Sequence, residues 1–369
     1  MILHLHHPEI SKQLTSAKKK LFSFREVIIY VISLLLTALF LYWAFKGVNT
    51  TELWDNIRSA SLFWLLMLVL FQMLAHWFRA LRWKAIMESL KPDVSSLNLL
   101  GAVLIGYGLN NVVPRMGEVA RAVAVGKTEK LSKTSILGTV VVERIIDMSV
   151  FAFAVVLSGW IYEGDIYSGE LSWLKLTLEI GTLAFIVLIT GLILLIRFKE
   201  RFSDLATSWV SKFSERSANK LEELFHKMIV GFSTLKTKEA YFKTVIYSVL
   251  IMLGYAATSW AGFYALGMEA KYSVLGFGAA WIIMSISAIG VMIPTPGGIG
   301  SVHTITKSAL LMLYSIPAEL GLAFATFQHG VTYLLHFVVA GAFLVYFKFK
   351  LPGMHTGDMI NLEDNGQQS

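Results

Sequence analysis

A series of long apolar segments, two of which end at breaks rich in proline and glycine, constrains the fold of this chain more than any other feature. The segments are residues 27–45, 61–81, 97–113, 135–160, 174–196, 244–266, 274–293, 301–316 and 318–347. Most reach the roughly 20 residues that a helix needs to cross a bilayer. Hydrophobic residues make up 55% of the 369-residue chain and charged residues only 15%, whereas about a quarter of the residues of a soluble protein are charged. The sequence therefore predicts an all-α polytopic integral membrane protein.

Several classes of function are excluded by what the sequence lacks. The chain has no cysteine, which excludes disulfides, thiolate metal sites and a cysteine nucleophile. It has no Walker A loop, dinucleotide fingerprint, nucleophile elbow or His-Glu-x-x-His motif. The net charge is +7, but the basic residues are grouped in loops, which indicates membrane topology rather than nucleic-acid binding. We therefore predict no enzyme activity, no cofactor and no metal site.

The distribution of basic residues predicts the orientation. Of the 32 lysines and arginines, 26 lie in one set of polar segments and five in the opposite set. The 26 occupy residues 1–26, 79–96, 114–133, 197–243 and the segment after 347. Basic loops stay on the cytoplasmic side of a membrane. We therefore expect an inner or plasma membrane protein with both termini in the cytoplasm, the basic tail 1–26 and the disordered tail 348–369 among them.

This orientation predicts two broken hairpins. Because the loops on both sides of residues 97–130 are cytoplasmic, this segment is expected to enter the membrane, break between Asn110 and Pro114, and return. Residues 274–316 are expected to do the same from the outside, with their break at Pro294 to Gly300. Bilayers tolerate such backbone only where it is buried in protein or lines a wet cavity.

The two halves of the chain then match. Residues 27–160 and 174–347 would each contain three full spans and one broken hairpin, running in opposite directions, which gives about six full spans. Inverted repeats with paired broken helices are typical of transporters, whose substrate sites lie at the breaks. An alternative is that 274–293 spans alone. The insert 197–243 is predicted to be an amphipathic helix that lies on the cytoplasmic leaflet or packs under the bundle.

Residues around the first break form the first part of the predicted substrate site. Free N–H groups and partial positive charge at a helix N-terminus suit an anion, and arginine can grip a phosphate in two places. A lipid phosphate is the expected ligand, and ordinary positive-inside arginines are the alternative. The predicted site residues here are Asn111, Pro114, Arg115, Gly117, Glu118 and Arg121.

Three charges lie inside the span 135–160, namely Glu143, Arg144 and Asp147. Charges at such depth normally face the protein interior and mark pathways or buried pairs. We expect these carboxylates to balance the hairpin arginines or to accept a cationic headgroup. The alternative is an internal salt bridge that locks this helix to Arg115 or Arg121.

The end of the span 61–81 carries His76, Arg79, Arg82 and Trp83. Tryptophan beside arginine at the end of a span is typical of interfacial anchoring and snorkelling, which is the preferred interpretation. The alternative is that these side chains line the route by which a headgroup enters.

The second break supplies the remaining predicted site residues. Glycines allow close approach of the backbone to a ligand. Further along the chain, His303 and Lys307 are four residues apart, and His329 and His336 are seven apart on one face. The histidines could form a proton relay, although buried histidines with satisfied hydrogen bonds are the preferred interpretation. The site residues predicted at the break are Pro294, Pro296, Gly297, Gly298 and Gly300.

Taken together, four motifs resemble a known family. They are Arg79-Ala80-Leu81-Arg82-Trp83, then Asn111 to Glu118 with Arg121, then Glu143-Arg144 with Asp147, and finally Pro294 to Gly300. In this order and spacing the chain, over about residues 25–347, resembles the transmembrane region of lysylphosphatidylglycerol synthase, also called the flippase-like family. One departure is His303, where the family often has glutamate.

The resemblance implies a flippase-like membrane domain. In bifunctional members this domain moves an aminoacylated phospholipid made by a separate soluble domain, so the resemblance does not support aminoacyl transfer here. We expect binding and translocation of an anionic or aminoacylated phospholipid or a polyprenyl-phosphate lipid. The alternatives are a non-transporting partner of an envelope-lipid or polyprenyl-lipid glycosylation enzyme, and an ion or small-solute carrier. A homo-oligomer is compatible with each.

Overall fold

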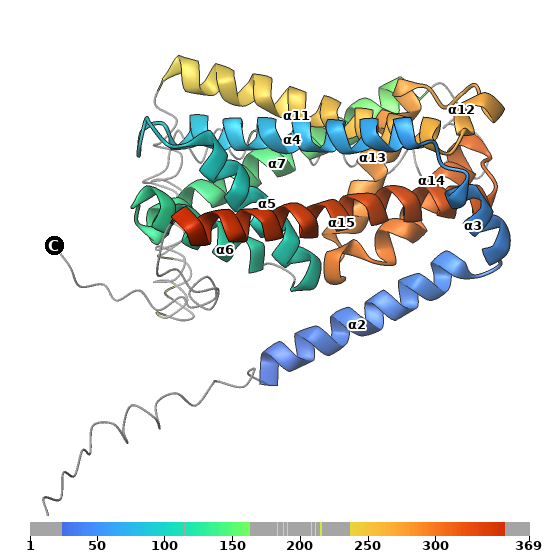
Figure 1. Cartoon of the computed structure of the whole chain (residues 1–369), viewed down its shortest axis with the longest axis horizontal. Coiled ribbons are helices and arrows are strands. Elements are labelled where there is room, and N and C mark those ends of the chain that lie inside the picture. Colours follow the sequence, from blue (N-terminus) through green and yellow to red (C-terminus); the bar gives the residue numbers. More distant parts are fainter. Residues whose placement is uncertain are drawn as a thin grey trace, which may run out of the picture.

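The computed structural model describes residues 24–113, 116–162 and 237–350, together with a few single residues between 183 and 215. This described part is helical and contains no strand (Figure 1). Its elements are α2 (Phe24–Phe45), α3 (Thr50–Arg58), α4 (Leu62–Met87), α5 (Ser96–Val112), α6 (Met116–Glu129), α7 (Lys133–Ile161), α11 (Lys238–Ala265), α12 (Met268–Lys271), α13 (Phe277–Met292), the 3-10 helix η2 (Pro296–Gly298), α14 (Ser301–Tyr314) and α15 (Ala318–Lys350).

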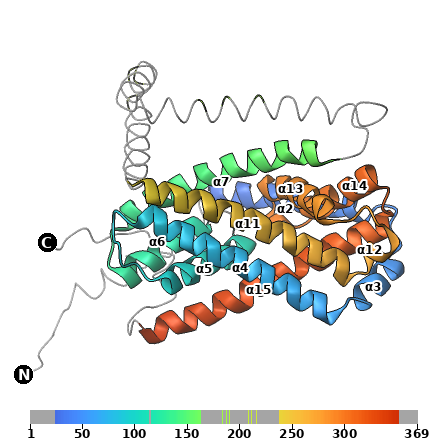
Figure 2. The same cartoon turned by 90° about the horizontal axis from the view of Figure 1, so that it is seen from above.

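Long apolar helices form the frame of the molecule. Within the described residues α4, α11 and α15 are long and apolar enough to cross a membrane, and α2 with α3, bent by 88°, makes a fourth if the pair is counted as one span. Seen from above, α4 and α11 lie between α7 and α15 (Figure 2). The predicted span 174–196 and nearly all of the insert 197–243 lie outside the described residues. The prediction of about six full spans is therefore not tested by the described residues and stays a prediction.

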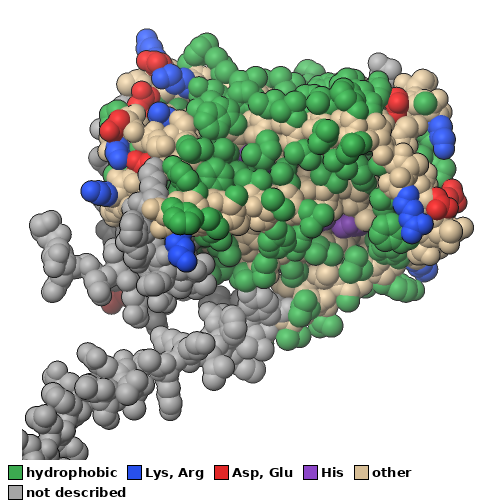
Figure 3. Space-filling model, viewed as in Figure 1, with side chains coloured by type: hydrophobic (Ala, Val, Ile, Leu, Met, Phe, Trp, Pro, Cys, Tyr) green, Lys and Arg blue, Asp and Glu red, His purple; other side chains and the backbone are tan. Residues whose placement is uncertain are grey.

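The surface has the pattern that a bilayer requires. Hydrophobic side chains form a broad band across the face seen in Figure 3, and charged side chains gather at its two ends. Large apolar side chains such as Leu35, Leu62, Val245 and Val338 are more than half exposed. Soluble proteins rarely expose so much contiguous apolar surface. The chain is a membrane protein with several apolar helices.

The first hairpin is α5 packed against α6, with the break between Val112 and Met116. Pro114 and Arg115 themselves lie outside the described residues. A Cβ atom on Gly117 would overlap the carbonyl oxygen of Gly106, so glycine at this position lets the two helices touch. The Gly117 N–H donates to the Asn110 Oδ1 atom at 2.7 Å, which satisfies one of the free donors at the start of α6.

The base of the first hairpin is closed by Glu129. Its carboxylate accepts hydrogen bonds from Lys91 Nζ at 2.7 Å, from Asn98 Nδ2 at 2.6 Å and from the backbone N–H of Ser95. These contacts join the loop that precedes α5 to the last residue of α6. The hairpin is therefore fixed at its base as well as at its turn.

The second hairpin is α13, η2 and α14. Its turn depends on three glycines with positive φ, Gly297 at 59°, Gly298 at 75° and Gly300 at 84°. Residues with a Cβ atom rarely adopt this conformation. Ser301 Oγ donates to the Gly290 carbonyl at 2.7 Å, and a Cβ on Gly290 would lie 2.8 Å from Val302 Cα. Small and hydroxylated residues therefore let α13 and α14 pack closely, as is common between membrane helices.

The two hairpins approach each other from opposite ends of the molecule. Figure 1 places α5 and α6 toward the end where α15 finishes, and α13 and α14 toward the end occupied by α3. Their turns meet between these ends, because Tyr333 Oη donates to the Asn111 carbonyl at 2.9 Å, and a Cβ on Gly297 would lie 3.3 Å from that same oxygen. This arrangement is compatible with two inverted repeats, which stay a prediction.

Helix α2 is attached to the second hairpin. Lys307 Nζ donates to the carbonyls of Trp43 at 2.9 Å and Ala44 at 2.7 Å. Carbonyls at a helix C-terminus lack intrahelical partners and carry partial negative charge, so a lysine is stabilising there. A Cβ on Gly300 would lie 2.9 Å from the Thr37 carbonyl and from Leu41 N. The glycine thus allows the turn to lie directly on α2.

Candidate functional site

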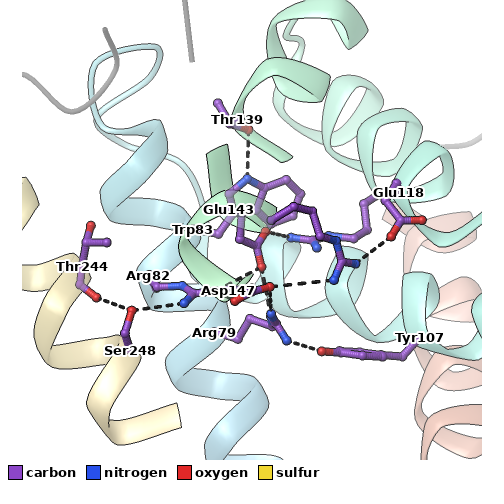
Figure 4. A network of polar contacts seen from close by, with 12 residues as sticks. Arg79, Arg82, Trp83, Tyr107, Glu118, Thr139, Glu143, Asp147, Thr244 and Ser248 are labelled. Atoms are coloured by element: carbon purple, nitrogen blue, oxygen red, sulfur yellow. Dashed lines mark hydrogen bonds and ion pairs between the residues drawn. The ribbon is translucent and has the colours of Figure 1, made fainter. Parts of the chain in front are cut away.

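Glu143, in the first half of α7, is the centre of a buried cluster of charges (Figure 4). Its side chain is completely buried and accepts a hydrogen bond from Arg79 Nε at 2.9 Å and another from Arg121. Arg82 lies 3.6 Å from the same carboxylate. Arginines from α4 and α6 therefore converge on one carboxylate of α7. The alternative in which a salt bridge joins this span to Arg121 is present in the structure.

Asp147, one turn further along α7, is the second acceptor. Both Arg79 and Arg82 donate to it, one to each carboxylate oxygen (Figure 4). Arg144 lies 3.8 Å from Asp147 and donates to Glu118 of α6 at 2.7 Å. The i, i+3 spacing of Arg144 and Asp147 thus gives only a long contact, and the shorter bond of Arg144 goes to the first hairpin.

Neutral side chains complete the surroundings of the arginines. The guanidinium carbon of Arg121 lies 4.1 Å from the ring centre of Trp83, a cation–π geometry. The Trp83 N–H donates to Thr139 Oγ1 at 3.0 Å, and Arg82 donates to Ser248 Oγ at 3.1 Å. The arginines are therefore held from several helices at once.

The interfacial-anchor interpretation of Arg79, Arg82 and Trp83 is wrong. Arg82 and Trp83 are 0% exposed, and Arg79 is 6% exposed. The physical reason is that the carboxylates of α7 lie opposite this end of α4, so the arginines bind carboxylates in the interior and do not reach for the membrane surface. His76 is also fully buried. That these four side chains line an entry route for a headgroup stays a prediction.

Among the residues that the structure describes, the cluster contains more positive than negative charge. Four arginines, Arg79, Arg82, Arg121 and Arg144, face three carboxylates, those of Glu118, Glu143 and Asp147. Among the described residues, Arg82 Nε and Arg121 Nε are buried donors without a hydrogen-bond partner, and Glu118 Oε2 is a buried acceptor without one. A buried charge without a partner is costly. Because the arginines exceed the carboxylates by one, one further anion would stabilise the cluster.

Exposure rises steadily across the cluster. The Glu143 and Arg82 side chains are completely buried, whereas the Asp147 side chain is 17%, Glu118 27% and Arg144 40% exposed. The accessible edge is therefore the Arg144–Glu118 pair, between α6 and α7. Arg115 belongs to the segment just before α6, but it lies outside the described residues.

The predicted residues of the second break lie apart from this cluster. Within the described residues no hydrogen bond or ion pair joins the segment Pro294 to Gly300, Pro296 and Gly298 included, to the arginines. Their neighbours are α2, Tyr333 and Asn111 of the first break. The glycines are explained by positive φ and close packing, and their predicted contact with a substrate stays a prediction.

Several side chains of the site carry no signal in the sequence. Tyr107 accepts a hydrogen bond from Arg79, and Tyr255 Oη lies 3.3 Å from the same guanidinium. Thr139 and Ser248 are likewise ordinary residues of apolar helices when the sequence is considered alone. Only the packing of α5, α7 and α11 around α4 assigns them to the site. No group of three or more metal-ligating side chains occurs in the part of the chain that the structure describes.

Comparisons with known proteins agree with the membrane architecture. The chain is 25% identical over 280 residues to a UPF0104 membrane protein of Methanothermobacter thermautotrophicus, covering 73% of this chain and 80% of that protein. It is 24% identical over 312 residues to a UPF0104 membrane protein of Methanocaldococcus jannaschii, covering 82% and 90%. A UPF0104 membrane protein of Pyrococcus horikoshii is 21% identical over 337 residues. No solved structure matches the chain significantly.

The match to a protein family covers most of the described fold. It extends over residues 30–340, from α2 into α15, and includes both hairpins and the whole arginine–carboxylate cluster. The chain belongs to the family described as the lysylphosphatidylglycerol synthase TM region.

Proposed function

We propose that this protein binds the phosphate group of a membrane lipid at the accessible edge of the arginine–carboxylate cluster and translocates the lipid across the inner membrane. The single observation that carries the proposal is the charge of the cluster, four arginines against three carboxylates, with buried guanidinium donors that have no partner in the described residues. An anionic phosphate supplies the missing charge and acceptor oxygens. The proposal is one of transport and not of catalysis.

Arg144 and Glu118 are the proposed first contacts of the headgroup. Their ion pair is the most exposed part of the cluster, with the Arg144 side chain 40% and the Glu118 side chain 27% exposed. A phosphate that reaches this edge can therefore compete with Glu118 for Arg144. Glu118 is then available to an amino group, which would let the site accept an aminoacylated or zwitterionic headgroup as well as a purely anionic one.

The two breaks are the proposed path through the bilayer. Non-helical backbone at membrane depth is tolerated only beside protein or a wet cavity, and in transporters such breaks mark the substrate path. Here the first break leads directly into Gly117 and Glu118, and it touches the second break through Asn111 and Gly297. A movement of one hairpin relative to the other would therefore change the position of Glu118, one of the proposed headgroup contacts.

The test is lipid movement in proteoliposomes. The purified protein would be reconstituted with a trace of fluorescent phosphatidylglycerol or its lysylated derivative, and bleaching of the outer leaflet would be followed. We expect bleaching to pass the plateau of protein-free vesicles. Arg144→Gln should slow the movement about ten- to a hundredfold, because a hydrogen bond to a charged group contributes about 1.5–3 kcal/mol.

The matched control is Arg58→Gln, which removes an equal charge at the exposed end of α3. It should move lipid at the rate of the unmodified protein. If the unmodified protein stays at the plateau with every headgroup tested, transport by the isolated chain is refuted. The interpretation as a partner of an envelope-lipid enzyme would then be favoured.

A further inference from the structure

A second buried polar group lies beside the arginine–carboxylate cluster and has no role in the function proposed so far. His76 of α4 and His336 of α15 face each other with their Nε2 atoms 3.0 Å apart. Gln72 Nε2 lies 3.0 Å from the same Nε2 atom of His76. His76 is 0% exposed, Gln72 7% and His336 9%. All three lie near the middle of helices long enough to cross a membrane.

The protons available to the two rings limit the hydrogen bonds that this pair can form. Two neutral imidazoles hold one proton each, and only one N–H can lie between two facing Nε2 atoms. Whichever tautomer His76 adopts, its Nδ1 atom is buried and has no hydrogen-bond partner among the described residues. Burying such a group without a partner is costly. The pair is thus a buried, titratable group in which one ring nitrogen of His76 has no partner among the described residues.

Tyr107 connects the pair to the arginine cluster. Its ring stacks on His336 with an interplanar angle of 14° and a centroid distance of 4.8 Å, and it lies 4.8 Å from the ring of His76. Its hydroxyl accepts a hydrogen bond from Arg79. Arg79 in turn bonds both Glu143 and Asp147. One aromatic ring therefore separates the histidines from the charges of the proposed lipid site.

The titratable and charged groups around the pair come from each neighbouring helix. They are Arg79 on α4, Tyr107 on α5, Tyr255 on α11, His329 and Tyr333 on α15, and, beyond Arg79, Glu143 and Asp147 on α7. The two carboxylates are already bound by arginines. A proton added to the histidines would therefore increase a local excess of positive charge.

We propose that the His76–His336 pair binds a proton and that proton binding and the binding of an anionic lipid favour each other. The lipid half of this proposal rests on the function proposed above. A positive charge on the pair strengthens the attraction of the cluster for a phosphate, and a bound phosphate lowers the cost of charging the pair. The coupling is reciprocal by thermodynamic necessity. Protons are thereby taken up with the lipid and can drive its movement.

The proton site is tested directly by nitrogen NMR of the intact protein labelled with 15N-histidine in detergent micelles. Imidazole resonances would be followed from about pH 8 to about pH 4.5, the range in which histidine acts as a switch. The expected result is a titrating pair of resonances that is lost in His76→Gln and in His336→Gln. The control is His329→Gln, seven residues away on the same helix, which should leave these resonances in place. If the resonances of the pair do not move over this range, the proposal is overturned, whether or not the protein transports lipid.

The coupling is tested with a short-chain anionic lipid, dihexanoyl phosphatidylglycerol. Its dissociation constant should fall by about 5- to 150-fold on protonation of the pair, the range typical of coupled sites. This pH dependence should be lost in His336→Gln and kept in His329→Gln. If the pair titrates but affinity does not change with pH, the coupling is refuted. If affinity is coupled to pH but no lipid crosses the bilayer, the function proposed above fails and the proton site stands.

Discussion

Glu143 shows how one carboxylate can organise several helices. It is completely buried, and its partners come from α4 and α6. Removing one partner of a buried ion pair leaves the others uncompensated, which costs more than the pair itself contributes. The same residue therefore supports the fold of the site and sets the charge available to a ligand.

We predict that Glu143→Gln destabilises the protein by about 3–5 kcal/mol, because three arginines lose their shared acceptor. The measurement is the thermal unfolding of the protein in detergent, followed by tryptophan fluorescence. The matched variant Arg144→Gln removes a charge from the 40% exposed edge of the cluster and should change stability by only about 1 kcal/mol or less. Equal melting temperatures for Glu143→Gln and the unmodified protein would contradict the central role of Glu143.

The hairpins illustrate what glycine contributes at the scale of an element. Gly117 brings α6 against Gly106 of α5, and Gly290 brings α13 against the backbone of Val302. Without a strong hydrophobic driving force between membrane helices, close packing through small residues is a main source of their association. Each broken hairpin can therefore act as one body, held by contacts along its length.

We predict that Gly117→Ala separates α5 from α6, because the new methyl group would overlap the Gly106 carbonyl and lie 2.6 Å from Asn110 Nδ2. Overpacking of this kind typically costs about 1–3 kcal/mol. The control is Gly341→Ala in α15, where an added Cβ meets no atom within 4 Å. That variant should be neutral or more stable by about 0.5–1 kcal/mol, because alanine favours helix over glycine. Thermal unfolding compares the two variants, and a stable Gly117→Ala protein would show that the hairpin can relax.

The described part of the molecule is a bundle of apolar helices with charged side chains at its two ends (Figure 3). Helix α4, with 26 residues and a rise of 1.5 Å per residue, is about 39 Å long, which exceeds the hydrocarbon thickness of a bilayer. Asp55 in α3 precedes it, and Asp93 follows it, and both are exposed. These positions should therefore lie on opposite sides of the membrane.

The absence of cysteine makes this arrangement directly testable. Single cysteines would be introduced as Asp55→Cys and Asp93→Cys and labelled with a membrane-impermeant maleimide in spheroplasts. The excess of basic residues around position 93 predicts that this position is cytoplasmic. The maleimide should therefore label Asp93→Cys only after the spheroplasts are lysed, whereas it should label Asp55→Cys in intact spheroplasts. Labelling of both from the outside would contradict the arrangement, and reversed labelling would contradict the orientation.

Much of the element structure follows from local sequence. The expected segments 61–81, 97–113, 135–160 and 244–266 correspond to α4, α5, α7 and α11 to within a few residues at most ends. Hydropathy over about 20 residues decides whether a helix can enter a bilayer, and proline with glycine decides where it ends. Both are properties of neighbouring residues, so the sequence alone carries them.

The composition of the site was decided only by the tertiary structure. The sequence predicted that the charges of α7 and Arg121 of the first hairpin could pair, and they do. It favoured a surface role for Arg79 and Arg82, which in fact bind Glu143 and Asp147. Separations of 64 and 65 residues leave no local trace of those bonds. In the same way, Tyr107 and the His76–His336 contact exist only because α5 and α15 pack beside α4. Membrane insertion is a local property of each segment, whereas charge pairing depends on which segments become neighbours.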